Sequence, residues 1–196
     1  MLLLAHGAGA PMDSDFMNAM ADAVAAQGIS VARFEFPYMH RRRIEGRQFP
    51  PDRAPKLIEH FSRVVEQARS IGLPVWIGGK SMGGRMASML AADSSLPMQE
   101  HVKGVVALGY PFHPPGKPEK IRTEHLHELQ KPLLICQGTR DPFGKSDEVS
   151  GYGLPEQILV RWLEGGDHDF KPLKRSGRDQ EELIVEAAAQ LGMFIS

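Results

Sequence analysis

Short apolar runs alternate along the chain with segments in which apolar residues recur at helical spacing. The runs have the length of strands and little polar alternation, which is typical of parallel strands buried on both faces. We predict six strands: Leu2 to Ala5, Val31 to Phe36, Val75 to Ile77, Val102 to Leu108, Leu133 to Cys136 and Ile158 to Leu163. This order predicts an α/β fold with a mostly parallel sheet and helices on both faces.

Four segments between or after these strands have an apolar helical face. Their apolar positions are Phe16, Met20, Ala23 and Val24; Leu57, Phe61, Val64, Val65 and Ala68; Met86, Met89 and Leu90; and Leu183, Ile184, Ala187, Ala188 and Leu191. Ser14 is placed to cap the first of these helices, and Gly28 is placed to end it. We interpret the stripes as core, because a helix that packs on a sheet needs an apolar face.

Two stretches do not fit this pattern. One spans residues 37–55, and the other spans residues 111–118 and leads into a short predicted helix within residues 119–130. Both follow strands, so we expect them at the carboxyl edge of the sheet, where open α/β folds bind ligands. Neither is long enough to form a separate lid domain, so residues 1–196 are predicted to form one domain.

Five arginines lie in the first of these stretches, and one lysine, Lys80, lies just after the third predicted strand. We interpret them as a solvated face rather than as contacts to an acidic substrate. They are Arg41, Arg42, Arg43, Arg47 and Arg53, together with Lys80.

Composition and charge narrow the class of partner. The chain is 42% hydrophobic with a formal net charge of −1, which gives no electrostatic reason to bind nucleic acid or a membrane surface. No stretch approaches the roughly 18 apolar residues of a membrane span. The single cysteine, Cys136, lies in an apolar run and is predicted to be a buried, reduced thiol. We therefore expect a cytoplasmic protein whose partner is a small molecule.

The most informative motif is Gly-x-Ser-x-Gly at residues 79–83. It comes directly after the predicted strand that ends at Ile77 and directly before a helical segment. This is the context of a nucleophile elbow, a strained turn that lifts a serine hydroxyl clear of the sheet. Ser81 is therefore the candidate nucleophile, although a glycine-rich turn with an idle serine would have the same spelling.

Two other interpretations of these glycines are excluded by spelling. A phosphate-binding P-loop that ends in Lys80 and Ser81 would need a glycine at position 74, which is Pro74. The dinucleotide motif that would begin at Gly7 has its third glycine replaced by Met12.

A serine nucleophile needs a base and an orienting acid, which follow it on this fold in the order acid, then histidine. Asp141 follows the strand that contains Cys136, and His168 follows the last strand. They are the candidates, although Asp141 before a proline is also a common turn opener and His168 lies between two aspartates. The remaining candidate histidines are interpreted as surface or loop residues; they are His101, His113, His125 and His127, with His6 stabilising its own loop.

Acyl transfer also needs backbone N–H groups that stabilise an oxyanion. We assign one to Met82, the residue after the nucleophile, and one to Ala8 in the loop after the first strand, with Gly9 as its rival. Residues just past strand ends are candidates for the substrate pocket: Gly9, Tyr38, Met39, Phe112 and His113. This chemistry requires no metal and no organic cofactor.

The motifs together resemble those of the α/β-hydrolase superfamily along essentially the whole chain. The segments that carry the resemblance are residues 6–10, 34–38, 78–84, 137–142 and 166–170. The chain looks most like the small hydrolase-like family that includes testis-expressed protein 30 and regulatory subunit 3 of the NSL chromatin complex, and more distantly like dienelactone hydrolases. The resemblance implies a second strand outside the first, and a compact form without the two leading antiparallel strands of larger relatives.

The resemblance and the motifs lead to one expected function and two alternatives. The expected function is a serine hydrolase that cleaves an ester, thioester or similar acyl bond through an acyl-enzyme. Some members of the small family act in protein complexes, so a binding or scaffold module that retains the fold is one alternative. A peptidase or acyltransferase with the same three residues is the other.

Overall fold

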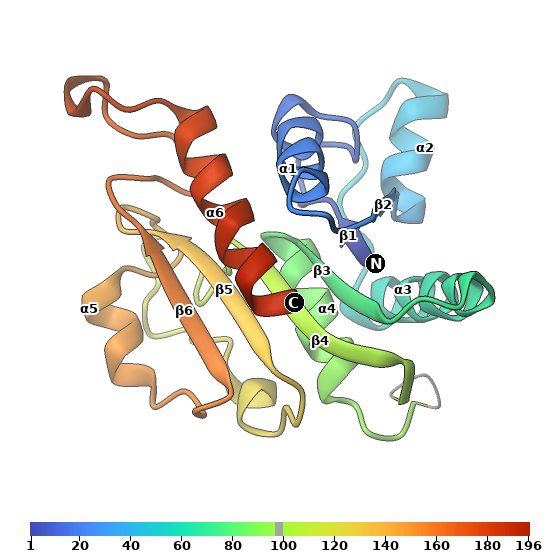
Figure 1. Ribbon diagram of the computed structural model, residues 1–196. Helices are drawn as coiled ribbons and strands as arrows, with labels where there is room; N and C mark the ends of the chain where they lie inside the picture. Colours follow the sequence, from blue (N-terminus) through green and yellow to red (C-terminus); the bar gives the residue numbers. More distant parts are fainter. Residues whose placement is uncertain (97–99) are drawn as a thin grey trace.

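The computed structural model describes residues 1–96 and 100–196 and contains one six-stranded parallel sheet (Figure 1). The strand order is β2-β1-β3-β4-β5-β6, so the second strand lies outside the first, as expected. The strands are β1 (Leu2–Ala5), β2 (Val31–Phe34), β3 (Val75–Lys80), β4 (Val102–Leu108), β5 (Leu133–Gly138) and β6 (Ile158–Leu163). Every pairing between them is parallel; in register, Leu4 lies opposite Arg33 of β2 and Gly78 of β3.

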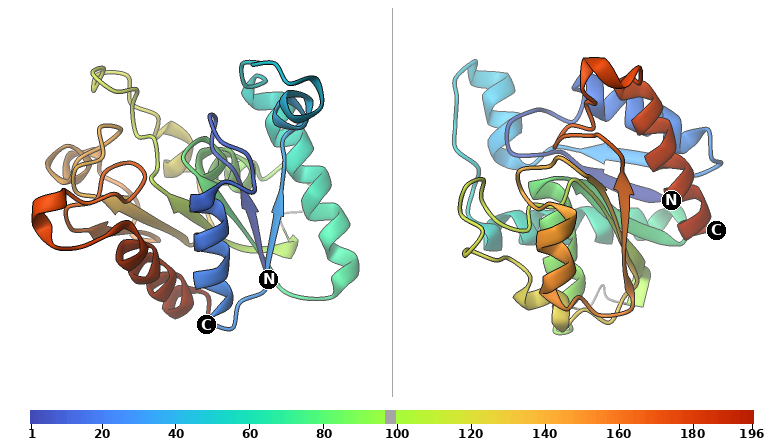
Figure 2. Two further views of the ribbon diagram at one scale, coloured as in Figure 1. Left: turned by 90° about the horizontal axis from the view of Figure 1, so that it is seen from above. Right: turned by 90° about the vertical axis from the view of Figure 1, so that its left-hand side faces the viewer.

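Helices cover both faces of this sheet (Figure 2). The α-helices are α1 (Asp15–Ala25), α2 (Pro37–Glu45), α3 (Ala54–Ala68), α4 (Met82–Ala92), α5 (Ser146–Val149) and α6 (Gln180–Ile195). Short 3-10 turns are η1 (Arg69–Ile71), η3 (Glu124–His127), η4 (Ser150–Tyr152) and η5 (Lys174–Ser176). Helices α1 and α6 pack together on one face, and α3 and α4 pack together on the other. The predicted fold class is confirmed.

The sheet divides the core into two layers because successive residues of a strand point to opposite faces. In β1, Leu2 and Leu4 join the layer under α1 and α6, whereas Leu3 and Ala5 join the layer under α3 and α4. Strands β4 and β5 alternate in the same way. Burying each leucine contributes about 1.5–3 kcal/mol, which explains why the predicted strands are apolar throughout. Of the helices in the described part of the chain, none combines the length and apolar character that crossing a membrane requires.

Helix α1 differs slightly from its prediction. Its buried face includes Met17 and Ala21, whereas Phe16 is only partly buried and turns toward the ring of Phe170, with the ring centroids 5.4 Å apart. Ser14 occupies the N-cap position, but its side chain makes no capping hydrogen bond. The five predicted apolar positions of α6 are all buried, as expected.

The stretch at 37–55, predicted as irregular, contains helix α2. Pro37 occupies its first turn, and Gly46 ends it in the left-handed conformation with φ 65°. These are the usual start and stop residues of a helix, but only Tyr38 and Met39 are buried, so the segment has no apolar stripe. Phe36 caps this helix, and strand β2 therefore ends two residues earlier than predicted.

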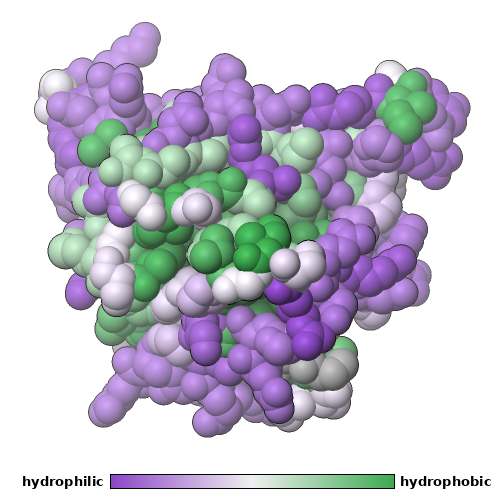
Figure 3. Space-filling view, turned by 45° about the vertical axis from the view of Figure 1, so that its right-hand side comes forward, coloured by the Kyte–Doolittle hydropathy of each residue, from purple (hydrophilic) through white to green (hydrophobic). Residues whose placement is uncertain are grey.

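Strand β2 forms one edge of the sheet, opposite the edge formed by β6, and all four of its residues are half-buried. Figure 3 brings the right-hand side of Figure 1 forward. On this face apolar residues gather from the middle to the left of the view, and hydrophilic residues lie above and below them.

Candidate active site

The chain turns sharply at Ser81, between β3 and α4. Ser81 has φ 51° and ψ −115°, a conformation that costs a non-glycine residue about 1–3 kcal/mol. The glycines on either side make the turn possible: a Cβ on Gly79 would lie 2.6 Å from the backbone carbon of Gly83, and one on Gly83 would lie 2.7 Å from the carbonyl oxygen of Ala5. The backbone around Ser81 is therefore packed too closely for larger residues, as a nucleophile elbow requires.

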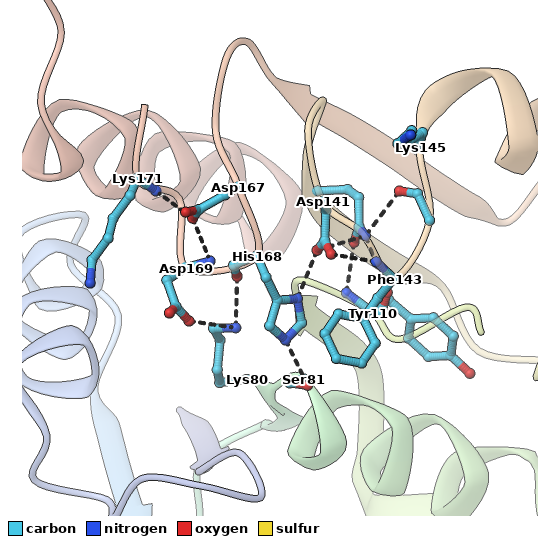
Figure 4. Close-up of polar contacts among 12 residues, drawn as sticks. Lys80, Ser81, Tyr110, Asp141, Phe143, Lys145, Asp167, His168, Asp169 and Lys171 are labelled. Atoms are coloured by element: carbon cyan, nitrogen blue, oxygen red, sulfur yellow. Dashed lines mark hydrogen bonds and ion pairs between the residues drawn. The ribbon is translucent and has the colours of Figure 1, made fainter. Parts of the chain in front are cut away.

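Three side chains that are distant in sequence meet at this turn (Figure 4). The Ser81 hydroxyl oxygen lies 2.9 Å from Nε2 of His168, and Nδ1 of His168 lies 2.8 Å from Oδ2 of Asp141. Because a carboxylate only accepts, Nδ1 carries the proton and Nε2 is left to accept one from Ser81. They come from the ends of parallel strands, which lie at one edge of the sheet.

The carboxylate of Asp141 is fully buried and fully hydrogen-bonded. Its Oδ1 accepts from the Phe143 N–H at 2.8 Å, and its Oδ2 also accepts from Nε2 of Gln137 at 2.9 Å. The amide of Gln137 is itself oriented, because its Oε1 accepts from the Tyr110 N–H at 2.7 Å. The sequence motifs did not assign Gln137 to the site; a glutamine at the end of a buried strand is the signal that identifies it.

The loop that carries His168 is held by its neighbours. Oδ1 of Asp167 accepts from the N–H groups of Asp169 and Lys171, each at 2.9 Å. The ring of Phe143 packs against the imidazole, with the ring centroids 4.2 Å apart. Phe143 was missed because its partner comes from a different loop.

Lys80 is buried, so its interpretation as a solvated residue is wrong. Its Nζ donates to the carbonyl oxygen of His168 at 2.7 Å and pairs with Asp169 at 3.3 Å (Figure 4). Burial lowers the pKa of Lys80, and the charge of Asp169 opposes this shift. Lys80 thus ties the elbow strand to the loop of His168.

The side chains of His6 and Tyr38 hold the loop that follows β1. His6 accepts from the Phe36 N–H through Nε2 at 3.1 Å, so its Nδ1 donates to the Gly7 oxygen at 2.6 Å; burial lowers the pKa of His6 and keeps it neutral. The Tyr38 hydroxyl lies 3.2 Å from the Gly7 oxygen and 3.1 Å from the Ala8 oxygen. In a trans peptide the N–H points opposite to the C=O, so the N–H groups of Ala8 and Gly9 point away from Tyr38.

Ser81 lies between two hollows that share Ala8 and Phe143. The first has a volume of about 340 Å³ and is also lined by Gly7, Gly9, Ala10, Ser14, Phe16, Met17, Lys80, His168 and Asp169. The second has a volume of about 310 Å³ and is also lined by Asp52, Ala54, Leu57, Met82, Arg85, Met86, Pro111 and Arg122.

The structure corrects most of the predicted pocket residues. Gly9 lines the first hollow, but Met39 and Phe112 are buried in the core, where Phe112 packs against Tyr110. The Tyr38 hydroxyl contacts backbone oxygens of the loop after β1 and does not line either hollow. His113 is also buried, and its Nε2 lies 3.4 Å from the Glu148 carboxylate. Tyr38 and Met39 are the buried residues of α2, and Phe112 belongs to the core cluster, so these residues after β2 and β4 face inward.

His125 also differs from its prediction as a surface or loop residue. Its Nε2 lies 2.9 Å from the hydroxyl oxygen of Ser88, which is fully buried. Burial lowers the pKa of His125 to about 4. In this second serine–histidine pair the serine is enclosed and the histidine is half-buried, whereas Ser81 lies at two hollows.

Three arginines of the region 41–47 are exposed, as interpreted: Arg41, Arg43 and Arg47. Arg41 pairs with Glu45 at 2.6 Å, and Arg43 pairs with Asp13 at 2.8 Å. Arg42 is only partly exposed and donates to the Ala8 oxygen at 3.3 Å, so it supports the loop after β1.

Comparisons with known proteins agree with this fold. Solved structures with a similar fold include an alpha-beta serine hydrolase homologue from Coxiella burnetii (TM-score 0.70, 18% identity, 97% of this chain and 85% of that chain). They also include Est1E from Butyrivibrio proteoclasticus (TM-score 0.70, 14% identity, 98% of this chain and 86% of that chain). A third is a dienelactone hydrolase from Anabaena variabilis (TM-score 0.68, 19% identity, 98% of this chain and 83% of that chain). A family model described as an alpha/beta hydrolase domain matches residues 1–196, and the chain therefore belongs to that family.

Proposed function

We propose that this protein is a serine hydrolase that cleaves an ester, thioester or related acyl bond through an acyl-enzyme. The observation that supports this function most strongly is the continuous hydrogen-bonded series from buried Asp141 through His168 to Ser81, which lies at two hollows. Solved structures of similar fold are named as a dienelactone hydrolase and an esterase domain, which supports an acyl bond as the target.

The geometry supports a two-step reaction. The Ser81 oxygen attacks the carbonyl carbon while its proton passes to Nε2 of His168, and Asp141 stabilises the imidazolium that forms. The leaving oxygen or sulfur then takes that proton as its bond to carbon breaks. Water attacks the acyl-enzyme by the same path in reverse, which releases the acid and restores Ser81.

The oxyanion would be held by two backbone N–H groups. Met82 is the first residue of α4, where N–H groups are free of helical partners and the helix dipole is positive. For the second donor we favour Ala8, because Ala8 lines both hollows, whereas Gly9 lines the first. Each such donor is worth about 10²–10³ in rate where one has been removed.

We also propose, on the motifs alone, a closer kinship with the small family that includes testis-expressed protein 30 and regulatory subunit 3 of the NSL complex. Because members of that family act in protein complexes, a binding module is the alternative that the experiment must exclude.

The test compares the purified protein with Ser81→Ala, using a fluorophosphonate probe and burst kinetics with 4-nitrophenyl acetate and butyrate. Loss of Ser81 should abolish labelling and lower kcat by about 10⁴-fold or more, with the fold intact by circular dichroism. Ser70→Ala, a change at an exposed serine distant from the hollows, is the control.

Equal background rates and no labelling in the unaltered protein would favour the binding module. Labelling retained by Ser81→Ala would overturn the assignment of the nucleophile. Transfer of the acyl group to an added alcohol or amine in preference to water would identify an acyltransferase.

A further inference from the structure

The second hollow carries two arginines next to Ser81. Arg85 lies on α4, four positions after Ser81, so both are on the same side of the helix end. Arg122 comes from the segment that follows β4, before the turn η3. Two arginines from separate segments therefore line one cavity at the candidate nucleophile.

Neither guanidinium has a carboxylate partner within residues 1–96 and 100–196. Nε of Arg85 is buried and makes no hydrogen bond there. Arg41, Arg43 and Arg178, by contrast, each pair with an acid. An unpaired, partly buried cation is costly unless an anion compensates it, so these two arginines leave a site for a negative charge.

The two arginines also repel each other. Burial and the nearby charge of Arg85 both lower the pKa of Arg122. Like charges held this close are relieved by an anion between them, and a guanidinium matches a carboxylate with two parallel hydrogen bonds.

A buried polar network holds both arginine segments in place. The Ser88 hydroxyl donates to the Arg85 carbonyl at 2.9 Å, and the Tyr110 hydroxyl donates to the Arg122 carbonyl at 3.0 Å. Nε2 of His125 joins the two, 2.9 Å from the Ser88 oxygen and 3.4 Å from the Tyr110 oxygen. Because the two backbones are tied to one half-buried ring, little backbone ordering is needed when an anion binds.

One acid, Asp52, also lines the second hollow. Its Oδ1 pairs with Nζ of Lys56 at 2.8 Å, while its Oδ2 is buried and makes no hydrogen bond to the described residues. Lys56 balances this single negative charge, so the charges of Arg85 and Arg122 remain in excess at this cavity.

The two hollows have different roles if the proposed function holds. His168 must return its proton to the leaving atom, and His168 lines the first hollow and not the second. The leaving group therefore occupies the first hollow, and the acyl chain occupies the second, beside Arg85 and Arg122.

We propose that the second hollow binds a carboxylate at the far end of the acyl chain, held by Arg85 and Arg122. The substrates are then half-esters or half-thioesters of short dicarboxylic acids, which suit a cavity of about 310 Å³. This inference rests on the proposed function for the identity of the acyl side, but anion binding itself is measured without turnover.

The test measures binding to Ser81→Ala by calorimetry, with monomethyl adipate as the anionic probe and dimethyl adipate as its neutral counterpart. The monoester should bind at least tenfold more tightly than the diester. Adding Arg85→Gln or, separately, Arg122→Gln should reduce that preference at least tenfold. Arg53→Gln removes the same charge from an exposed arginine outside this hollow and should leave the preference unchanged.

A matched kinetic experiment compares mono-4-nitrophenyl adipate with methyl 4-nitrophenyl adipate as substrates of the protein with Ser81 present. The ratio of their kcat/KM values should favour the half-ester and fall at least tenfold in Arg122→Gln. Circular dichroism checks that each variant is folded, and two independent arginine variants guard against a local loss of structure.

The outcomes separate the two proposals. Equal binding of the two adipates, or a preference that survives both arginine changes, overturns the carboxylate site. Neutral-ester turnover that depends on Ser81, without a preference for the half-ester, overturns this inference and leaves the hydrolase standing. Preferential binding of the monoester without Ser81-dependent turnover supports the site and counts against the hydrolase.

Discussion

Replacing Lys80 with methionine should separate activity from stability. The change keeps an apolar stem of similar length and removes the ammonium group. Three contacts disappear: the hydrogen bond to the His168 carbonyl at 2.7 Å, the ion pair with Asp169 at 3.3 Å, and the cation–π contact with Phe16, whose ring centroid lies 5.4 Å from Nζ. The first two hold the loop that positions the imidazole (Figure 4).

The expected size of the effect follows from these contacts. A hydrogen bond from a charged donor contributes about 1.5–3 kcal/mol. A factor of ten in rate corresponds to about 1.4 kcal/mol, so kcat should fall about 10- to 100-fold if this energy positions His168. The free energy of unfolding should change by less than about 2 kcal/mol, because removing a buried ammonium also removes its desolvation cost, the cause of the lowered pKa of Lys80.

The assay measures kcat and KM with 4-nitrophenyl butyrate, together with urea unfolding. Lys171→Met is the matched control, since Lys171 belongs to the same loop but its side chain is exposed. A kcat within threefold of the unaltered protein would refute the positioning role. A fall in kcat accompanied by a loss of several kcal/mol of stability would show that Lys80 acts only through the fold.

Two further predictions concern stability. Gly79→Ala should destabilise the fold by about 3 kcal/mol, because the new Cβ would lie 2.6 Å from the backbone carbon of Gly83. The control is Gly151→Ala, since the space around Gly151 is open. Equal urea midpoints for the two variants would contradict the packing argument. Burial holds the pKa of His125 at about 4, below its usual value, so the unfolded chain binds a proton first as pH falls. Stability should therefore decline between about pH 6.5 and 4, less steeply in His125→Asn; parallel curves would argue against this cause.

The local pattern of apolar residues was enough to predict most of the strands and helices. A run such as Leu2 to Ala5 is apolar on both faces, so it predicts a strand between two layers of helices whatever its partners are. In a parallel sheet the carboxyl ends of all strands lie at the same edge. The order of the residues along the chain and their places at strand ends were therefore enough to predict that Ser81, Asp141 and His168 lie together.

Two of the expectations failed, each for its own physical reason. Helix α2 was missed because it buries only Tyr38 and Met39, and periodicity detects a helix only through a buried stripe. Met39 and Phe112 were assigned to the pocket from their place after a strand, but the direction in which the next segment turns decides whether such a side chain faces the pocket or the core.

The sequence by itself determined the fold class, the strained turn at Ser81 and the strand ends that supply Asp141 and His168. Only the tertiary structure decided the partners: the amide of Gln137 on Asp141, the ammonium of Lys80 on the His168 loop, and Arg85 and Arg122 on one hollow. The physical reason is the distance along the chain over which each kind of interaction acts. Strand and turn preferences act within a few residues, whereas hydrogen bonds and cavity walls join atoms that the packing of distant segments brings together.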